Sequence, residues 1–473
     1  MNRTAVINIV GLTGGLIGPA TPNIARFARQ GKTARILPAF PAVTCTAQSN
    51  YLTGQNPAQH GIVGNGWYDR ALAEVHFWKQ SNHLVAGPKI WEQPRQADPK
   101  FTCAQLFWWF NMYSTADYSI TPRPAYPADG RKVFDIYSWP ANIRPEIKRD
   151  LGEFPFPAFW GPAAGVNTPQ GAADAASRWI AESAKWIESR YSPTLSLIYL
   201  PHLDYNLQRH GPWAGIQPNP AILPDLAHID SIAGDLISWF ESRGVRIILL
   251  SEYGITTVDT PVHLNHLFRQ KGWIAVRDEL GLELLDCGAS RAFAVADHQI
   301  AHIYLNDPSL AGPAREFLQA QPGVESVLGE AEKAALGINH QRAGDLIAVA
   351  AERAWFTYYY WMDDALAPDF ARCVDIHRKP GYDPVELFLD PEIPLVKLKI
   401  LWRLAQKQLG FRMLMDVIPL DASLVKGSHG RRVTAPREQP VLICDQSAAS
   451  LPEQIDSTDV AAIIKRQILE RRL

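Results

Sequence analysis

Residues 41–69 read PAVTCTAQSNYLTGQNPAQHGIVGNGWYD, a stretch with little apolar periodicity and many small polar residues. A surface loop built from several turns would explain its Thr-Gly, His-Gly and Asn-Gly pairs. Alternatively, a helix begins near Thr44 and presents the threonine hydroxyl as a nucleophile beside a metal ion. A helix N-terminus favours both an ionised hydroxyl and an incoming phosphate group. The second interpretation requires metal ligands elsewhere in the chain.

Strand and helix patterns alternate along most of the chain. Continuous apolar runs at residues 5–10, 195–200 and 245–250 predict buried strands, and amphipathic stretches at 172–189 and 224–243 predict helices. Further strands are expected at residues 292–295, 303–305, 345–349 and 441–444. Buried strands separated by amphipathic helices are typical of parallel sheets that are covered on both faces. We therefore predict an α/β fold with a mostly parallel central sheet and helices on both faces.

Two regions interrupt this alternation. Residues 85–170 are rich in proline and aromatic residues, and residues 356–425 begin with FTYYYW and end in an amphipathic Leu/Lys helix. We predict that residues 1–473 form a single domain and that the two regions are insertions, or cap segments, that cover one edge of the sheet. Ligands of open α/β sheets bind beyond the carboxyl ends of the strands, so the site is expected there.

Composition excludes several classes of function. The chain has 473 residues, of which 47% are hydrophobic, and a net charge of −2, so no basic surface indicates nucleic-acid binding. Apolar runs are shorter than the ~18 residues of a transmembrane helix. The five cysteines are odd in number and lack CxxC spacing, which favours reduced thiols over disulfides. We predict a cytoplasmic globular protein with no nucleic-acid or membrane partner, and the sequence leaves its oligomeric state open.

Polar groups gather where the predicted strands end. Thr44 and Gln48 lie in the opening stretch, PHLDYNLQRHGP follows one strand at residues 201–212, and SEYG follows another at residues 251–254. The segment GSHG at residues 427–430 precedes the last strand. Carboxylate, amide and imidazole groups from different strand ends are suitable ligands for a divalent metal ion, and such an ion would lower the pKa of a threonine hydroxyl.

These motifs resemble the alkaline phosphatase superfamily, specifically its type I phosphodiesterase/nucleotide pyrophosphatase family. In that family TPN opens the first helix, FP-x-x-T presents a metal-bound threonine nucleophile, and TG-x-x-P-x-x-HG-x-x-x-N follows. The positions that match are Thr21-Pro22-Asn23, Phe40-Pro41, Thr44, Thr53-Gly54, Pro57, His60-Gly61 and Asn65. Downstream, D-x-x-x-H-x-x-GP, SDHG and a closing HG are matched by Asp204, Gln208, Gly211-Pro212, Ser251-Glu252-Tyr253-Gly254 and His429-Gly430. The resemblance implies an alkaline-phosphatase-like fold and hydrolysis of phosphate esters.

The resemblance also implies positions for two zinc ions. One zinc site corresponds to Asp204, Gln208 and His429, and the other to Val10, Thr44, Glu252 and Tyr253. Four of these residues differ from the family, which has Asp at 10, His at 208, Asp at 252 and His at 253. Ala47 stands where the family has an Asn that binds the phosphoryl group. The altered set predicts a divalent metal, zinc in the first place, with Mg²⁺, Mn²⁺ or Ca²⁺ also suited to oxygen ligands. It leaves open whether the site holds one ion or two.

Other residues are candidates for binding the substrate or for replacing a ligand. They are Tyr253, His377, Asn65 and Gln48. His377 precedes a GYDP segment that resembles the HGYDP of many bacterial members of the family, so it competes with His429 as the last ligand, and we favour His429. The histidines at 298 and 302 lie next to a predicted strand, which favours a strand or turn over a metal site, and His60 is expected to shape its loop.

Two classes of function remain. The first is a metal-dependent hydrolase of phosphate esters, of the phosphodiesterase or nucleotide pyrophosphatase type, that uses Thr44 as its nucleophile and a small-molecule phosphate ester as its substrate. The second is a member of the family that has lost catalysis and acts as a binding or scaffold protein, because fold does not determine function. A phosphate mutase is a weaker third alternative. We favour the hydrolase.

Overall fold

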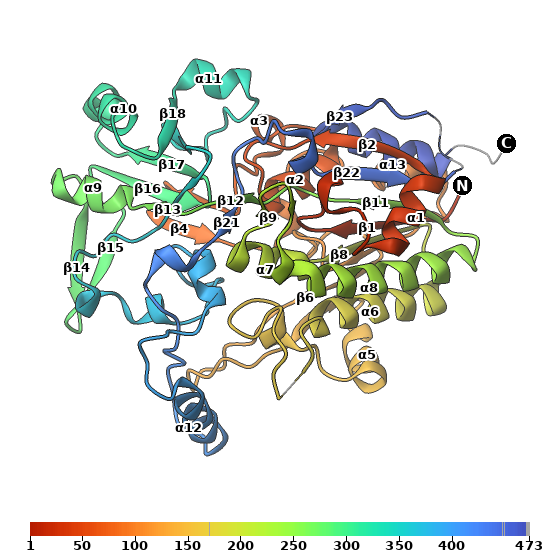
Figure 1. Cartoon of the computed structure of the whole chain (residues 1–473), viewed down its shortest axis with the longest axis horizontal. Helices are drawn as coiled ribbons and strands as arrows, with labels where there is room; N and C mark the ends of the chain where they lie inside the picture. The colour runs from red at the N-terminus through yellow and green to blue at the C-terminus, as the bar shows by residue number, and fades with distance from the viewer. Residues whose placement is uncertain (170, 447, 449, 470–473) are drawn as a thin grey trace.

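The computed structural model of the chain describes all residues except 170, 447, 449 and 470–473. Its centre is a nine-stranded sheet with the strand order β23-β2-β22-β11-β1-β8-β5-β6-β7 (Figure 1). The strands are β1 (Thr4–Ile9), β2 (Lys32–Leu37), β5 (Cys103–Leu106), β6 (Tyr118–Pro122), β7 (Ile136–Trp139), β8 (Leu195–Leu200), β11 (Arg246–Leu250), β22 (Val441–Cys444) and β23 (Gln454–Asp456). Strand β1 pairs in parallel with β8 and β11, whereas β22 and β7 pair antiparallel with their neighbours. The prediction of a mostly parallel central sheet is confirmed.

Helices cover both faces of this sheet because successive side chains of a strand point to opposite faces. On one face, Ile7 and Ile9 pack with α1 (Pro22–Gln30), α6 (Ala175–Tyr191) and α8 (Leu223–Glu241). On the other face, Val6 packs with α2 (Thr44–Thr53) and α13 (Val460–Leu469). Figure 1 shows α6 and α8 on one side of the sheet and α13 on the other. The expected two-faced coverage is therefore also confirmed.

A second, four-stranded antiparallel sheet lies beside the central one. Its order is β16-β17-β19-β18, and α9 (Leu264–Gln270) and α10 (Ala311–Gln319) pack against it. The strands are β16 (Ala292–Asp297), β17 (Ile300–Leu305), β18 (Val324–Leu328) and β19 (Leu346–Ala350). The strands expected near residues 292, 303 and 345 are thus present but belong to this sheet. The strand expected at 441–444 is β22 of the central sheet.

Further α-helices and strands complete the fold. They are α3 (Pro57–His60), α4 (Glu92–Ala97), α5 (Ile143–Leu151), α7 (His202–His210), α11 (Glu330–Ala335), α12 (Val396–Gln408), β3 (Gly66–Asp69), β4 (Glu74–Phe77), β9 (Trp213–Ala214), β10 (Gln217–Pro218), β12 (Thr256–Thr257), β13 (Thr260–Val262), β14 (Ala275–Glu279), β15 (Leu282–Asp286), β20 (Ala354–Phe356) and β21 (Gly427–Ser428). In the described part of the chain, no helix combines the length and the apolar character that crossing a membrane requires.

The two regions that interrupt the sequence pattern differ in their structural roles. The region at residues 85–170 contributes β5, β6 and β7 to one edge of the central sheet, so part of it belongs to the sheet itself. The region at residues 356–425 contributes α12 and several short turns, and its aromatic run at residues 358–361 is buried in a core of its own. The aromatic run at residues 107–110 is also buried. Both runs therefore fill cores, as aromatic residues mostly do.

His60 shapes the loop after α2, as the sequence predicts. Its side chain is fully buried, and Nδ1 accepts a hydrogen bond of 3.0 Å from the Ile62 N–H. Burial lowers the pKa of His60 to about 3, so the imidazole is neutral in the folded protein. Below pH ~6.5 the unfolded chain binds one more proton than the folded chain. The stability that neutral His60 contributes is therefore complete above that pH and is lost as the pH falls toward the folded pKa.

We expect the His60→Gln variant to lose part of the acid sensitivity of the protein. Between about pH 6 and about pH 4, its free energy of unfolding should fall less steeply than that of the parent, by up to ~1.4 kcal/mol per pH unit. Urea unfolding at several pH values measures this slope. The matched control is His83→Gln, because His83 is exposed. Equal slopes for His60→Gln and the parent would contradict the assignment.

Candidate active site

A small pocket opens at the carboxyl ends of β8 and β11, with a cavity volume of about 40 Å³. Five residues singled out from the sequence line it: Thr44, Asn65, Asp204, Tyr253 and His429. Aromatic side chains, among them Trp78, Trp109, Trp160, Tyr199 and Tyr382, form much of the remaining wall. The pocket therefore lies where ligands bind in open α/β sheets, and it joins segments that are far apart in the sequence.

Four polar side chains form a hydrogen-bonded chain beside this pocket. Thr44 is the first residue of α2, and its Oγ1 lies 3.2 Å from the Tyr253 hydroxyl. The same hydroxyl donates to Asp204 Oδ1 at 3.2 Å. Gln208, one turn along α7, donates its amide to Asp204 Oδ2 at 2.7 Å. Burial raises the pKa of Asp204 to about 7, and the hydrogen bonds from Tyr253 and Gln208 counteract that shift only in part.

Glu252 lies in a second polar cluster, which does not line the pocket. Its Oε1 accepts hydrogen bonds of 2.5 Å from the side-chain amides of Asn8 and Gln48. The Gln48 side-chain oxygen in turn accepts a hydrogen bond from the backbone N–H of Trp109. Burial raises the pKa of Glu252 to about 8, against hydrogen bonds from Gln48, Asn8 and Thr44 that lower it. The donors around both carboxyl groups are neutral amides and hydroxyls, so these contacts bring no positive charge to the site.

His429 follows β21, which pairs with β12 directly after the SEYG segment. Its Nδ1 donates to the Ala42 carbonyl at 2.8 Å, because a carbonyl can only accept. That hydrogen bond leaves the Nε2 lone pair free. The ring stacks on Tyr253 with centroids 3.8 Å apart and an interplanar angle of 6°, and burial lowers the pKa of His429 to about 3. His429 is therefore a neutral imidazole that offers Nε2 as an acceptor or ligand.

Strand β21 approaches α7 unusually closely. A Cβ at Gly427 would lie 2.1 Å from the Leu207 carbonyl oxygen, so only glycine fits there. The approach brings the segment with His429 against the helix that carries Asp204 and Gln208.

A further polar cluster supports Asn65. The Asn65 backbone N–H and side-chain amide donate to Asp297 at 2.8 and 3.1 Å. The Tyr382 hydroxyl accepts from Asn65 at 3.0 Å and donates to Asp297 at 3.2 Å. His298, in the tight turn between β16 and β17, lies 2.9 Å from the Tyr382 hydroxyl and has its ring centroid 3.9 Å from that of His429. The sequence interpretation missed Tyr382 and Asp297 as site residues, although Tyr382 belongs to the GYDP segment.

Three other residues named from the sequence lie outside the pocket. Val10 is fully buried in the core at the end of β1, and Ala47 packs in the core under α2. His377 stacks on Trp109 with centroids 6.4 Å apart, and its Nδ1 lies 3.2 Å from the Trp78 carbonyl oxygen. Burial lowers the pKa of His377 to about 4. His377 thus supports the aromatic wall of the pocket, and His429, the favoured alternative, is the histidine that enters it.

The Tyr253→Phe variant tests the hydroxyl that joins Thr44 to Asp204. We expect kcat for a phosphodiester to fall by about 100-fold, because the Thr44 hydroxyl loses the group that orients it. KM should change little, since the ring and its stacking on His429 remain. Steady-state kinetics measures both constants. Tyr51→Phe is the matched control, because Tyr51 donates to the Ser251 carbonyl outside the pocket. Unchanged kcat in Tyr253→Phe would remove the hydroxyl from the mechanism.

The chain matches the family model "Type I phosphodiesterase / nucleotide pyrophosphatase" over residues 4–383 and belongs to this family. An uncharacterized pyrophosphatase/phosphodiesterase of Schizosaccharomyces pombe is 23% identical over 273 residues, which cover 54% of this chain and 46% of that protein. The match thus spans about half the length of this curated relative. The family resemblance found in the sequence is confirmed.

Solved structures agree on the fold. Murine ectonucleotide pyrophosphatase/phosphodiesterase 5 superposes with a TM-score of 0.59 at 13% identity and covers 100% of this chain and 96% of its own. Phosphonoacetate hydrolase from Sinorhizobium meliloti 1021, in complex with phosphonoformate, gives a TM-score of 0.56 at 14% identity, with coverage of 99% and 95%. At these identities the likeness shows the fold alone.

Proposed function

We propose that this protein hydrolyses a phosphate ester, a phosphodiester or a pyrophosphate, with Thr44 as its nucleophile. The observation that carries the proposal is the position of the Thr44 hydroxyl. It lies in the pocket at the N-terminus of α2, within hydrogen-bond distance of Tyr253. Family membership supports the reaction class. A variant of murine ectonucleotide pyrophosphatase/phosphodiesterase 5 in which alanine replaces a threonine is described as inactive and was solved with AMP, which supports the role of a threonine in the family.

The residues of the pocket suggest how this reaction proceeds. Thr44 Oγ attacks phosphorus in line with the leaving alcohol, so that an O–P bond forms to Thr44 and the ester P–O bond breaks. Water then attacks the phosphothreonine and releases the phosphate product. Tyr253 orients the hydroxyl, and the N-terminus of α2 favours the negative phosphoryl group. The cavity is small, so we expect only the phosphoryl group to enter it and the organic group to lie against the tryptophans at its rim.

We propose that Asp204, His429 and Gln208 together hold one divalent cation. Asp204 offers a buried carboxylate that only neutral groups contact, and His429 offers a free Nε2 whose orientation a backbone carbonyl fixes, as is usual for metal-binding histidines. Gln208 Oε1 is buried and has no hydrogen-bond partner, so it suits a cation. Zinc fits the imidazole best, and Mg²⁺, Mn²⁺ or Ca²⁺ would fit the oxygens. When bound, such an ion would lower the pKa of the Thr44 hydroxyl and neutralise charge on the phosphoryl oxygens.

The second family position does not fit a metal ion equally well. Val10 has no ligand atom, and Tyr253 donates its proton to Asp204 instead of offering an imidazole nitrogen. Glu252 uses Oε1 for the amides of Asn8 and Gln48. We therefore propose one ion, and Glu252 contributes at most its second oxygen, which is buried without a hydrogen-bond partner.

Turnover and metal content together test the proposal. Purified protein is treated with a chelator, reloaded with Zn²⁺, Mg²⁺, Mn²⁺ or Ca²⁺, and assayed with bis-p-nitrophenyl phosphate and p-nitrophenyl phosphate. We expect turnover of the diester that is lost with the chelator and restored by a metal. His429→Gln should lower metal affinity and turnover by at least about 100-fold, whereas His83→Gln, at an exposed position that does not line the pocket, should retain both. A folded protein that turns over neither ester with any of these metals would overturn the proposal.

The second candidate is a non-hydrolysing member of the family that binds a phosphate ester. Two residues at the second family metal position favour it: Val10 has no ligand atom, and Glu252 is hydrogen-bonded to side-chain amides. This position is therefore poorly suited to the second metal ion that the family resemblance implies. Calorimetric binding of bis-p-nitrophenyl phosphate without its turnover would identify this function. We propose a cytoplasmic location as well. The five cysteines support it, because they are buried and free, which suits a reducing compartment.

A further inference from the structure

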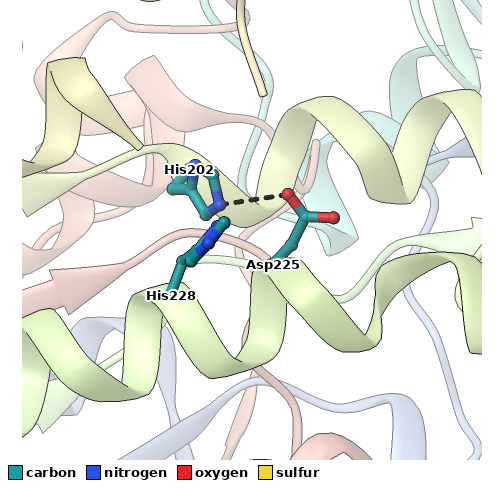
Figure 2. Close-up of side chains that lie close together, drawn as sticks. All are labelled: His202, Asp225 and His228. Carbon is teal, nitrogen blue, oxygen red and sulfur yellow. Dashed lines mark ion pairs between the residues drawn. The ribbon is translucent and has the colours of Figure 1, made fainter. Parts of the chain in front are cut away.

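A second group of metal-binding side chains lies between α7 and α8, outside the pocket. His202 is the first residue of α7, and Asp225 and His228 lie three residues apart near the start of α8. Figure 2 shows the three side chains pointing toward one another. Each offers a ligand atom, and these atoms all lie within 4.8 Å of one another. Among the residues that the structure describes, this is the one trio of His, Cys, Asp or Glu that meets this distance.

Each imidazole of this trio has a nitrogen without a hydrogen-bond partner, and that of His202 forms an ion pair with Asp225 (Figure 2). His202 is 1% exposed, and its Nε2 lies 3.0 Å from Asp225 Oδ1 without the alignment of a hydrogen bond. His228 Nδ1 is also buried and has no hydrogen-bond partner. A buried imidazole nitrogen normally has a partner. Two such nitrogens beside one carboxylate point to a shared cation.

The carboxylate of the trio is held in place by its neighbours. Asn206 donates to Asp225 Oδ1 at 2.9 Å and to the Gly165 carbonyl at 2.8 Å. The charge of Asp225 raises the pKa of the nearby Arg209, although burial lowers that pKa overall, to about 10. The Arg209 guanidinium donates to Asn206 and to the carbonyls of Ala164 and Leu387. Asp225 is therefore oriented by Asn206, and Arg209 is satisfied by other oxygens.

We propose that His202, Asp225 and His228 bind one divalent transition-metal ion, zinc in the first place. Two imidazoles and a carboxylate suit zinc and its neighbours better than Mg²⁺ or Ca²⁺, and three protein ligands leave a fourth position for water. His228 is half-buried, which gives the ion a path from solvent. The ion would fasten the start of α7 to α8, and α7 carries Asp204 in its first turn and Gln208 one turn further on. The site lies outside the pocket, and metal binding there is independent of the proposed hydrolysis.

Metal titration of chelator-treated protein tests this site. The parent, His228→Gln, His429→Gln and His210→Gln are titrated with Zn²⁺, and with Co²⁺ for its absorption spectrum. We expect His228→Gln to lose one equivalent of bound metal, or to bind it at least about 100-fold more weakly. His429→Gln should keep this equivalent, which separates the trio from the active site. His210 is exposed on the same helix, so His210→Gln is the matched control and should bind as the parent does.

Thermal unfolding supplies an independent readout. Added Zn²⁺ should raise the melting temperature of the parent, because a ligand of the native state stabilises it, and should raise that of His228→Gln much less. Asp225→Asn, which preserves shape, should behave like His228→Gln. The proposal is overturned if His228→Gln and the parent bind the same amount of metal with the same affinity, or if His429→Gln removes all metal that the parent binds.

A different observation concerns α12, which stands apart from the body of the molecule at the lower edge of Figure 1. Its outer face and the residues that flank it expose large apolar side chains. The side chains that are 58% to 76% exposed are Leu395, Leu398, Leu401, Trp402, Leu409 and Phe411. Contiguous exposed apolar surface of this kind marks an interaction site in a soluble protein.

The inner face of α12 is fixed on the body of the molecule. Val396 and Ile400 pack on the aromatic core that contains residues 358–361. Lys399 and Arg403 form ion pairs with Asp416 at 2.9 and 3.0 Å. Because these contacts fix the inner face of α12, its apolar outer face points away from the body of the molecule.

We infer that α12 docks on a membrane surface that contains anionic lipids. The segment at residues 393–415 carries five Lys or Arg residues and no Asp or Glu. Charge of this sign complements anionic lipid, and a Trp/Leu face that lies in the membrane–water interface is typical of peripheral amphipathic helices. Two of the five cations, Lys399 and Arg403, are paired with Asp416, which leaves Lys397, Lys407 and Arg412 to meet the lipid. A second copy of the chain fits less well, because face-to-face pairing would bring two sets of these three positive charges together. The inference differs from the sequence-based expectation of no membrane partner.

Co-sedimentation with lipid vesicles tests the docking surface. The full chain is mixed with vesicles of phosphatidylcholine alone or of phosphatidylcholine with phosphatidylglycerol. We expect the protein to bind the anionic vesicles, and we expect this binding to weaken as salt is added. A variant that combines Leu398→Ser, Leu401→Ser and Trp402→Ser should bind at least about tenfold more weakly. Leu280→Ser is the control, because Leu280 is exposed elsewhere. No binding to anionic vesicles, or equal binding of the triple variant, would overturn the inference, as would a stable dimer in gel filtration that the triple variant makes monomeric.

Discussion

Replacing Thr44 with alanine is expected to lower the turnover of a phosphodiester by at least about 1,000-fold, because loss of a nucleophile removes the covalent step. The change removes one hydroxyl and its contact with Tyr253. Neither Asp204 nor His429 forms a hydrogen bond with Thr44, so metal binding should persist. The measurement is kcat/KM for bis-p-nitrophenyl phosphate, together with the metal content of the same preparation.

Thr44→Ser is the matched variant for this prediction. It keeps a hydroxyl at the start of α2 and should retain measurable turnover, whereas Thr44→Ala should not. Trapping of a phosphorylated residue in Thr44→Ser, and its absence in Thr44→Ala, would identify the covalent intermediate. Turnover in Thr44→Ala within about tenfold of the parent would exclude Thr44 as the nucleophile.

The Lys379→Met variant is expected to be destabilised by about 3–5 kcal/mol, which is the usual cost of leaving one partner of a buried ion pair alone. Lys379 and Glu386 form an ion pair in which the side chains are 1% and 2% exposed. The ammonium group also donates to the Cys373 carbonyl at 3.0 Å. Glu386 also accepts a hydrogen bond of 2.9 Å from the indole N–H of Trp160, which lines the pocket. Chemical denaturation measures the loss of stability, and we expect weaker turnover as the pocket wall loosens.

A double variant separates the lost ion pair from lost packing. In Lys379→Met with Glu386→Gln, the uncompensated charge is removed, so we expect recovery of a large part of the stability that Lys379→Met loses. Arg353→Met is the control, because Arg353 pairs with Asp259 at the surface and its loss should change stability little. If Lys379→Met proved as stable as the parent, the buried pair would have no structural role.

The central sheet could be predicted because its strands are continuous apolar runs. The runs at residues 5–10, 195–200 and 245–250 correspond to β1, β8 and β11, and burial on both faces explains their composition. The partners of the later strands could not be predicted, because an apolar run shows that a strand exists but not which strand it pairs with. The strands near residues 292, 303 and 345 therefore belong to the second sheet, and residues 103–139 supply an edge of the first.

The pocket could be predicted in outline because its motifs fix residue types at strand ends. Thr44, Asp204 and His429 meet in one pocket, although they lie far apart in the sequence. The supporting contacts could not be predicted, since they depend on side chains that meet only after folding. Asn65 and Asp297 are 232 positions apart. Asn8 reaches Glu252 because it lies on the same face of β1 as Val6, the face that α2 covers.

The contact between Gly427 and Leu207 sets the mechanical behaviour of the site. Because backbone meets backbone there, no flexible side chain lies between the segment that carries His429 and the helix that carries Asp204. The spacing of these two residues is consequently as rigid as the main chain itself. Substitutions in the surrounding apolar core can change the free energy of unfolding, yet they should change the distance between Asp204 and His429 little.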